Sequence, residues 1–299
     1  MAVDAFDRWP LDVGNATAQD APESLEIPLA FVPPFARKLG ALASENGFAQ
    51  AVTEVLADAN ITVEYNGDLF DGSFSADKEQ GLIIASDHSH HLEPLLVQAA
   101  MSISGRNASN VMAMPISLSG RIMQGTEQGR ELVIPIIPTN WAAEKRIPLN
   151  KPRNILRRSL HPSVLNRPKA DLECINSRAT AQAAAVIARG ETVAIFPTGK
   201  SISNSNISWR TGIGHIVNKL PEEARDTTGL AVFQADLSAK HVLASLLLRD
   251  MGIRPRKQTV VLNANLLGSV SEICNPHIDK GPQAITDAVR DAAYARLTN

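Results

Sequence analysis

The sequence predicts an α/β protein in which a central sheet carries helices on its faces. Short apolar runs bounded by Gly, Pro or Asn alternate along the chain with longer segments whose apolar residues recur at helical spacing. The 299 residues suffice for one large domain or two small ones, and a hydrophobic content of 44% supports a core of normal size. We find no internal repeat and no low-complexity linker in the chain.

The first half of the chain contains two helical patterns and four candidate strands. Apolar residues recur at helical spacing over 34–58 and over 92–104, where Pro94 stands near the helix start and is tolerated. The candidate strands are 61–67, 81–86, 110–117 and 131–138. The segment SDHSHHLEP at 86–94 therefore lies at a strand-to-helix turn. Ligands bind at the carboxyl ends of strands in open α/β sheets, so this turn is a candidate site.

The second half continues the alternation. An Ala-rich helix is predicted over 176–190, with Asn176 or Ser177 available as its cap and Gly190 at its end. The later elements are a strand at 191–197, a helix at 211–220, strands at 229–237 and 258–268, and a closing amphipathic helix at 282–297. We divide the chain into a polar lead-in at 1–24, an N-terminal helical segment at 25–60 and an α/β domain at 61–299.

Composition excludes several classes of function. Aromatic residues make up 4% of the chain, which argues against single-strand binding by stacking, and a net charge of −2 argues against general nucleic-acid binding. Cys174 and Cys274 lie far apart and indicate free thiols in a reducing compartment. No apolar run approaches the ~18–20 residues that span a bilayer, and the acidic N-terminus is unlike a signal peptide. We therefore expect a soluble, cytoplasmic protein.

Three histidines within four positions raise the question of a metal site. His88 and His90 have the H-x-H spacing that can place two imidazoles on one ion. The Asp-His pair that continues this pattern in metallo-hydrolases is missing, and no H-E-x-x-H occurs anywhere. A metal-dependent hydrolase built on His88 and His90 therefore remains an alternative, and our main hypothesis assigns no metal. The Gly-Lys-Ser at 199–201 is not a phosphate loop, because position 194 is Ala where that motif requires Gly.

Two segments taken together resemble the glycerolipid acyltransferase family. His88, Glu93 and Pro94 form H-x-x-x-x-E-P, which is similar to the family's first block, H-x-x-x-x-D, often followed by Pro. The strand at 191–197 ends in Phe-Pro-Thr-Gly, which is similar to the third block. That block reads F-P-E-G-T-R-S, or P-S-G-G-R in the soluble plastid-type glycerol-3-phosphate acyltransferases. The segments GRELVIP at 129–135 and WRTGIGHIV at 209–217 resemble further parts of the plastid-type enzymes, in the same order along residues 61–299.

The resemblance implies a glycerol-3-phosphate acyltransferase-like fold, with a mixed, largely parallel sheet flanked by helices, and a reaction without metal or redox cofactor. His88 is then the general base that accepts the proton of the attacking hydroxyl, and Glu93 holds its imidazole. Glu93 is one methylene longer than the usual Asp of the family. Backbone N–H groups around Thr198 and Gly199 are candidate donors to the oxyanion.

The resemblance also implies the substrates: an acyl thioester of acyl carrier protein or coenzyme A, and a hydroxyl of glycerol-3-phosphate or a lysophospholipid. Lys200, Arg130 and Arg210 are the candidate cations for a phosphorylated acceptor. Residues 145–169 hold eight Lys or Arg and no acidic residue, which suits a solvated loop, an acidic carrier protein or peripheral contact with an anionic membrane. Because positions 93, 198 and 201 depart from the family pattern, an inactive acyltransferase fold that binds lipid or carrier protein is a further alternative.

Overall fold

A seven-stranded sheet forms the centre of the protein in the computed structural model, which describes residues 34–69, 80–86, 92–113, 120, 122–123, 125–137, 139, 167–198 and 208–298. Across the sheet the strand order is β1-β7-β6-β2-β5-β3-β4. The strands are β1 (Ile61–Asn66), β2 (Leu82–Ser86), β3 (Asn110–Ala113), β4 (Val133–Pro135), β5 (Thr192–Ile195), β6 (Gly229–Ala235) and β7 (Gln258–Ser269).

The sheet is mixed and largely parallel, as predicted. Strands β6, β2, β5, β3 and β4 run in one direction. Strand β7 pairs antiparallel with β6, and the edge strand β1 pairs parallel with β7. The predicted α/β fold class is therefore confirmed.

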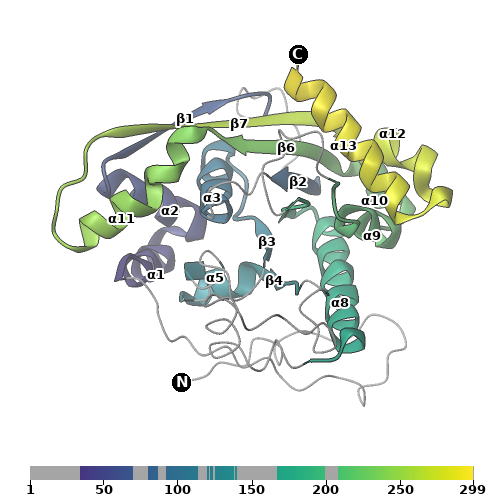
Figure 1. Ribbon diagram of the computed structural model, residues 1–299, viewed down its shortest axis with the longest axis horizontal. Helices are drawn as coiled ribbons and strands as arrows, with labels where there is room; N and C mark the ends of the chain where they lie inside the picture. Colours follow the sequence, from purple (N-terminus) through teal and green to yellow (C-terminus); the bar gives the residue numbers. More distant parts are fainter. Residues whose placement is uncertain are drawn as a thin grey trace, which may run out of the picture.

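Helices cover both faces of the sheet (Figure 1). One face carries α1 (Pro34–Asn46), α2 (Phe48–Asp58), α3 (Glu93–Ser104), α5 (Glu127–Leu132) and α11 (Val242–Asp250). The other carries α8 (Lys169–Ala188), α9 (Gly212–Lys219), α12 (Val270–Cys274) and α13 (Pro282–Thr298), with α10 (Glu222–Thr227) against α12. Two 3-10 helices, η3 (Leu237–His241) and η4 (Asn275–Lys280), complete the described elements. No helix among the described residues has the length and apolar character needed to cross a membrane.

Strand β2 shows why the sheet is covered on both sides. All five of its residues are buried, and successive side chains point to opposite faces. Leu82 and Ile84 join the core cluster that includes α1, α2 and α3, whereas Ile83 and Ala85 join the cluster that includes α8, α9 and α13. A continuous apolar run of this kind is typical of a parallel strand buried between two helical layers.

Three of the differences between predicted and observed element boundaries have a local explanation. The helical pattern over 34–58 forms two helices, because Gly47 adopts a φ of 81° between them. The predicted strand at 131–138 begins two residues later, since residues 131–132 complete α5. Helix α8 begins at Lys169 after Pro168 and not at 176, so Asn176 is not its cap. Of the predicted strand at 110–117, residues 114–117 lie outside the described residues.

Asp58, the last residue of α2, connects this helix to α1 and α11 through ion pairs. Its carboxylate accepts hydrogen bonds from Arg249 of α11 at 2.9 and 3.0 Å and lies 2.7 Å from the Nζ atom of Lys38 in α1. Mainly through the hydrogen bond from Arg249, these cations lower the pKa of Asp58 from 3.8 to about 2. The ionised carboxylate therefore stabilises the folded state at pH values above its unfolded pKa, and this contribution is lost as the pH falls through about 2.

Asp58→Asn is expected to lower the free energy of unfolding by about 1 kcal/mol at pH 7, because the carboxylate is partly exposed to solvent. The difference between the two proteins should shrink between pH 4 and pH 2. Urea denaturation of both proteins across this range measures it. A difference that stays constant with pH would contradict the ion-pair explanation.

Candidate functional site

The two segments singled out in the sequence follow neighbouring strands of the sheet. Strands β2 and β5 are parallel partners, and Ala85 pairs with Ile195 near their carboxyl ends. The first segment leaves β2 after Ser86, and the second leaves β5 with Phe196 and Pro197. Because adjacent strands lie about 4.8 Å apart, the two segments begin side by side at the same edge of the sheet.

The chain then leaves these strands toward opposite faces. After β2 it enters α3, whose buried residues belong to the cluster with α1 and α2. After β5 it reaches α9, whose buried residues belong to the cluster with α8 and α13. Adjacent parallel strands whose connections diverge in this way form a topological switch point, and ligands of open α/β sheets bind in the crevice at such a point.

Glu93 begins helix α3 at this edge. Its side chain is fully buried, and it is the acidic residue of the first helical turn, followed by Pro94. Proline is tolerated there because the first N–H groups of a helix have no partner within the helix. The positive end of the helix dipole also lies at this terminus and favours a carboxylate. The start of α3 therefore places a buried acidic side chain seven residues beyond the end of β2.

Thr198 and Arg210 mark the two ends of the second segment. The backbone N–H of Arg210 donates a hydrogen bond of 2.9 Å to the carbonyl oxygen of Pro197, so the chain returns to β5 before it enters α9. Thr198 is buried, whereas the side chain of Arg210 is exposed. Between them, Trp209 is buried and lies edge-on to Tyr294 of α13, with ring centroids 6.5 Å apart. Trp209 thus anchors the returning chain to the helical layer.

Arg130 has a different position. It lies half-buried in α5, where the hydroxyl of Thr126 caps the helix by accepting a 2.9 Å hydrogen bond from Gly129. Helix α5 leads into the amino end of β4, so all of β4 separates Arg130 from the carboxyl edge along the chain. Glu93, Thr198 and Arg210 follow the carboxyl ends of β2 and β5, whereas Arg130 precedes the amino end of β4.

His88, Gly199 and Lys200 lie outside the described residues, as does His90 of the metal hypothesis. Within the described part of the chain, no group of three or more His, Cys, Asp or Glu side chains could hold a metal ion. The assignments of His88 as base, Gly199 as oxyanion donor and Lys200 as phosphate ligand therefore stay predictions.

Neither a scan against models of protein families nor a search of curated proteins finds a match to this chain. Two further side chains, neither of which we singled out for a role at this site, fix the ends of strands in the same half of the sheet.

Asn176 fixes the chain where it leaves β4. Its side-chain amide exchanges two hydrogen bonds with the backbone of Ile137, one of 2.9 Å from the N–H of Ile137 and one of 2.8 Å to its carbonyl oxygen. This pairing positions the chain at the carboxyl edge next to β3. In the sequence, Asn176 is recognisable only as a polar residue in an Ala-rich helix. Such a residue also suits a helix cap, which is the role that the sequence offered for it.

Arg106 fixes the amino ends of β2 and β5, opposite the edge that carries the candidate site. Its guanidinium donates to the Thr192 hydroxyl at 3.2 Å, to the carbonyl of Gly190 at 3.4 Å and to the carbonyl of Gln80. These groups lie at the amino ends of β5 and β2, and burial lowers the pKa of Arg106 from its usual value. The strand pair that carries the candidate site is therefore fixed from its far end.

Proposed function

We propose that this protein is an acyltransferase that moves an acyl group from a thioester to a hydroxyl group, with His88 as base and Glu93 as its positioning residue. One observation carries the proposal: β2 and β5, which precede the two acyltransferase-like segments, are adjacent and parallel. Segments separated by about a hundred residues therefore begin together at a switch point of the sheet.

The chemistry assigns one task to each segment. The acceptor hydroxyl oxygen attacks the thioester carbonyl carbon while its proton passes to the imidazole of His88. The new C–O bond gives a tetrahedral oxyanion, which backbone N–H groups around Thr198 and Gly199 are suited to stabilise. When the C–S bond breaks, the sulfur leaves as the thiol of the carrier and takes the proton from the imidazolium.

Burial of Glu93 supports its role as positioning residue. A carboxylate that orients an imidazole has to be held still and shielded from water, as in hydrolase triads. Glu93 is fully buried at the first turn of a helix whose next residue is Pro94, and both features limit its movement. His88 stands five positions earlier in the sequence, between the end of β2 and the start of α3.

The acceptor is proposed to carry a phosphate group, with Lys200 and Arg210 as its ligands. Residue 200 follows Thr198 by two positions in the sequence, and the backbone of residue 210 is hydrogen-bonded to Pro197 at the end of β5. A lysine ammonium that pairs with phosphate makes a charge-assisted hydrogen bond, which is stronger than one between neutral groups. Glycerol-3-phosphate and lysophospholipids share this chemistry.

The proposal is tested by incubating the purified protein with long-chain acyl carrier protein or acyl-coenzyme A and each of the two acceptors. We expect thiol release that depends on the acceptor, and an acylated product by mass spectrometry. Thioester hydrolysis without transfer, or no thiol release with any pair, would contradict the proposal. Zinc or iron bound in stoichiometric amount to the purified protein would instead favour the hydrolase alternative.

Lys200→Ala is expected to raise the KM for a phosphorylated acceptor about ten- to hundredfold, as expected for the loss of one hydrogen bond between charged groups. The KM for a glycerol acceptor without phosphate should change little. Lys280→Ala is the matched control, because Lys280 is exposed in η4 and outside the site. An equal change for both acceptors would remove the phosphate assignment.

A further inference from the structure

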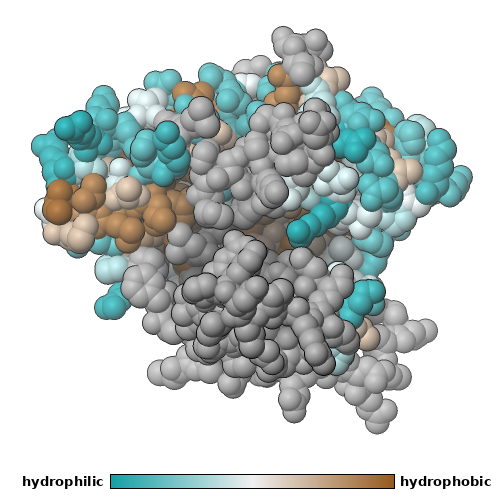
Figure 2. Space-filling model, in the orientation of Figure 1, coloured by the Kyte–Doolittle hydropathy of each residue, from teal (hydrophilic) through white to brown (hydrophobic). Residues whose placement is uncertain are grey.

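Two of the three large hydrophobic side chains that are exposed in the described residues lie in one turn. Met251 is 64% exposed and Ile253 is 51% exposed, whereas the third, Ile103, stands alone at the end of α3. Figure 2 shows hydrophobic surface at the left of the molecule, over the end of α11, where this turn lies in Figure 1. Single exposed apolar residues are common on proteins, but two in one turn beside a helix are a feature to explain.

The same turn is basic. Arg254, Arg256 and Lys257 follow Ile253, and all three are exposed. Within the described part of the chain none of the three forms an ion pair, while the nearby acids are engaged. Asp58 binds Lys38 and Arg249, and Asp250 accepts a hydrogen bond from the backbone N–H of Phe35. We call residues 251–257 the α11 tip, a surface with two exposed apolar side chains and three exposed basic side chains.

The α11 tip is held by backbone hydrogen bonds. The N–H of Gly252 donates to Arg249 and the N–H of Ile253 donates to Leu248, each at 3.0 Å, which is the Schellman pattern at the end of a helix. Gly252 has the positive φ of 76° that this pattern requires. The side chain of Asn60 donates to the carbonyl of Pro255 at 3.0 Å and fixes the far end of the turn. The apolar side chains are thus presented by an ordered turn.

We propose that the α11 tip docks on the surface of an anionic lipid bilayer. Met251 and Ile253 enter the boundary between headgroups and acyl chains, and Arg254, Arg256 and Lys257 contact the lipid phosphates. Surface association of this kind combines burial of apolar side chains with attraction of basic residues to anionic headgroups. The assignment is independent of the proposed acyl transfer and of the basic stretch at 145–169.

A bilayer fits this surface better than a folded protein partner. Stable protein interfaces bury about 800 Å² on each partner. The α11 tip is a projecting turn at one end of the molecule, and it offers two large apolar side chains (Figure 1). A lipid surface can accept such a projection because it deforms around it, and it supplies negative charge at every position.

Vesicle sedimentation of the full chain, without substrate, tests the proposal. We expect binding to vesicles of phosphatidylcholine with a quarter phosphatidylserine, weak binding to phosphatidylcholine alone, and loss of binding in high salt. Met251→Asp combined with Ile253→Asp should lower the partition coefficient more than tenfold. Arg254→Gln should lower it about fivefold, as expected for one basic residue near the surface.

Two matched controls keep the result specific. Ile103→Asp places the same change at the other exposed apolar side chain, and Lys280→Gln removes an exposed charge elsewhere, and neither should alter binding. Thermal melts should match those of the unchanged protein, since the substituted side chains are exposed. If the double variant fails to fold, Arg254→Gln tests the surface by itself.

Absence of binding to anionic vesicles would overturn the proposal. Vesicle binding that is unchanged by the substitutions in the α11 tip would also overturn it, because another surface would then be responsible for the binding. If the substitutions remove a complex with an acidic carrier protein and leave vesicle binding intact, the occupant is a protein and the proposal is also wrong. Because the assay contains no substrate, its outcome and that of the acyl-transfer assay are separate.

Discussion

His88→Ala is expected to lower acyl transfer from a thioester to the acceptor hydroxyl by about a thousandfold, the range that loss of a general base produces. The imidazole would be the group that accepts the hydroxyl proton, and alanine offers no replacement. The rate of thiol release, followed at saturating acceptor, measures the effect. The substrate KM values should change little, because the loss acts on the transition state.

His91→Ala is the matched control for this experiment. It removes an imidazole from the same segment, and we interpret His91 as a turn residue without a role in proton transfer. Its rate should stay within about threefold of the unchanged protein. Equal losses from His88→Ala and His91→Ala would indicate a general disturbance of the segment and would remove the assignment of the base.

The pH dependence of the reaction rate distinguishes an orienting role of Glu93 from a purely structural one. A carboxylate beside an imidazole favours the protonated form of the imidazole. Glu93→Gln should therefore move the acidic limb of the rate–pH profile to lower pH, in addition to lowering the rate. Glu93→Asp carries the residue usual in the acyltransferase family and should restore much of the activity. A lower rate with an unshifted profile would identify Glu93 as a structural residue.

Gly214→Ala is expected to lower the free energy of unfolding by about 3 kcal/mol, as overpacking and the loss of a buried hydrogen bond combine. A Cβ atom at residue 214 would lie 1.9 Å from the carbonyl oxygen of Pro282, at the start of α13. The N–H of Gly214 also donates to the Thr286 hydroxyl at 3.1 Å, and that hydroxyl in turn donates to Pro282 at 2.9 Å. Helix α9 would have to move away from α13, and this bond would be lost.

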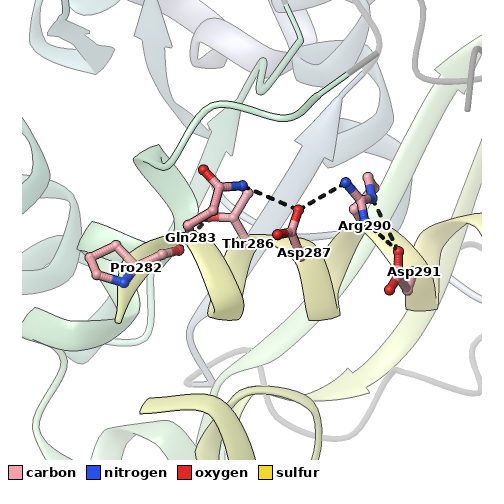
Figure 3. Close-up of polar contacts among 6 residues, drawn as sticks. All are labelled: Pro282, Gln283, Thr286, Asp287, Arg290 and Asp291. Atoms are coloured by element: carbon pink, nitrogen blue, oxygen red, sulfur yellow. Dashed lines mark hydrogen bonds and ion pairs between the residues drawn. The ribbon is translucent and has the colours of Figure 1, made fainter. Parts of the chain in front are cut away.

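Figure 3 shows that the opposing segment of α13 is itself ordered by polar contacts. Gln283 donates to Asp287, which also pairs with Arg290, and Arg290 contacts Asp291. These contacts link successive turns of the helix against which Gly214 packs. Urea denaturation measures the change in stability.

Gly40→Ala is the control for backbone effects, because Gly40 also lies inside a helix. A Cβ atom there would meet the side chain of Thr126 at 3.4 Å, an ordinary contact. Alanine should stabilise α1 by about 0.5–1 kcal/mol through its lower conformational entropy in the unfolded chain. If both substitutions have the same effect on stability, the close approach of α9 to α13 is not the cause.

Local sequence patterns predicted most of the secondary structure. The strands at 61–66, 82–86 and 229–235 and the helices at 93–104 and 212–219 all lie within predicted ranges. Errors arose where a local signal had two interpretations. Gly47 inside an apolar helical pattern suits a helix interior as well as a break, and Asn176 suits a cap as well as a clamp on Ile137.

The candidate site was predicted as two separate segments, with their proximity as a hypothesis. Strand order has no local signature, because β5 lies between β2 and β3 in the sheet although it follows both of them in the chain. The positions of Arg130 and Arg106 could not be predicted for the same reason. Arg130 resembled a family segment, but its helix leads into the amino end of β4. Arg106 had no motif at all, although it holds the ends of β2 and β5.

Residue pattern was enough for the α/β class, for strand β2 and for the helix that begins at Glu93, since apolar periodicity and turn residues act over a few neighbours in the chain. Tertiary packing decided that β2 and β5 end at the same edge of the sheet, and that the helices that follow them, α3 and α9, pack on opposite faces. Two helical layers must each bury an apolar face against the same sheet, and this requirement selects one strand order among many.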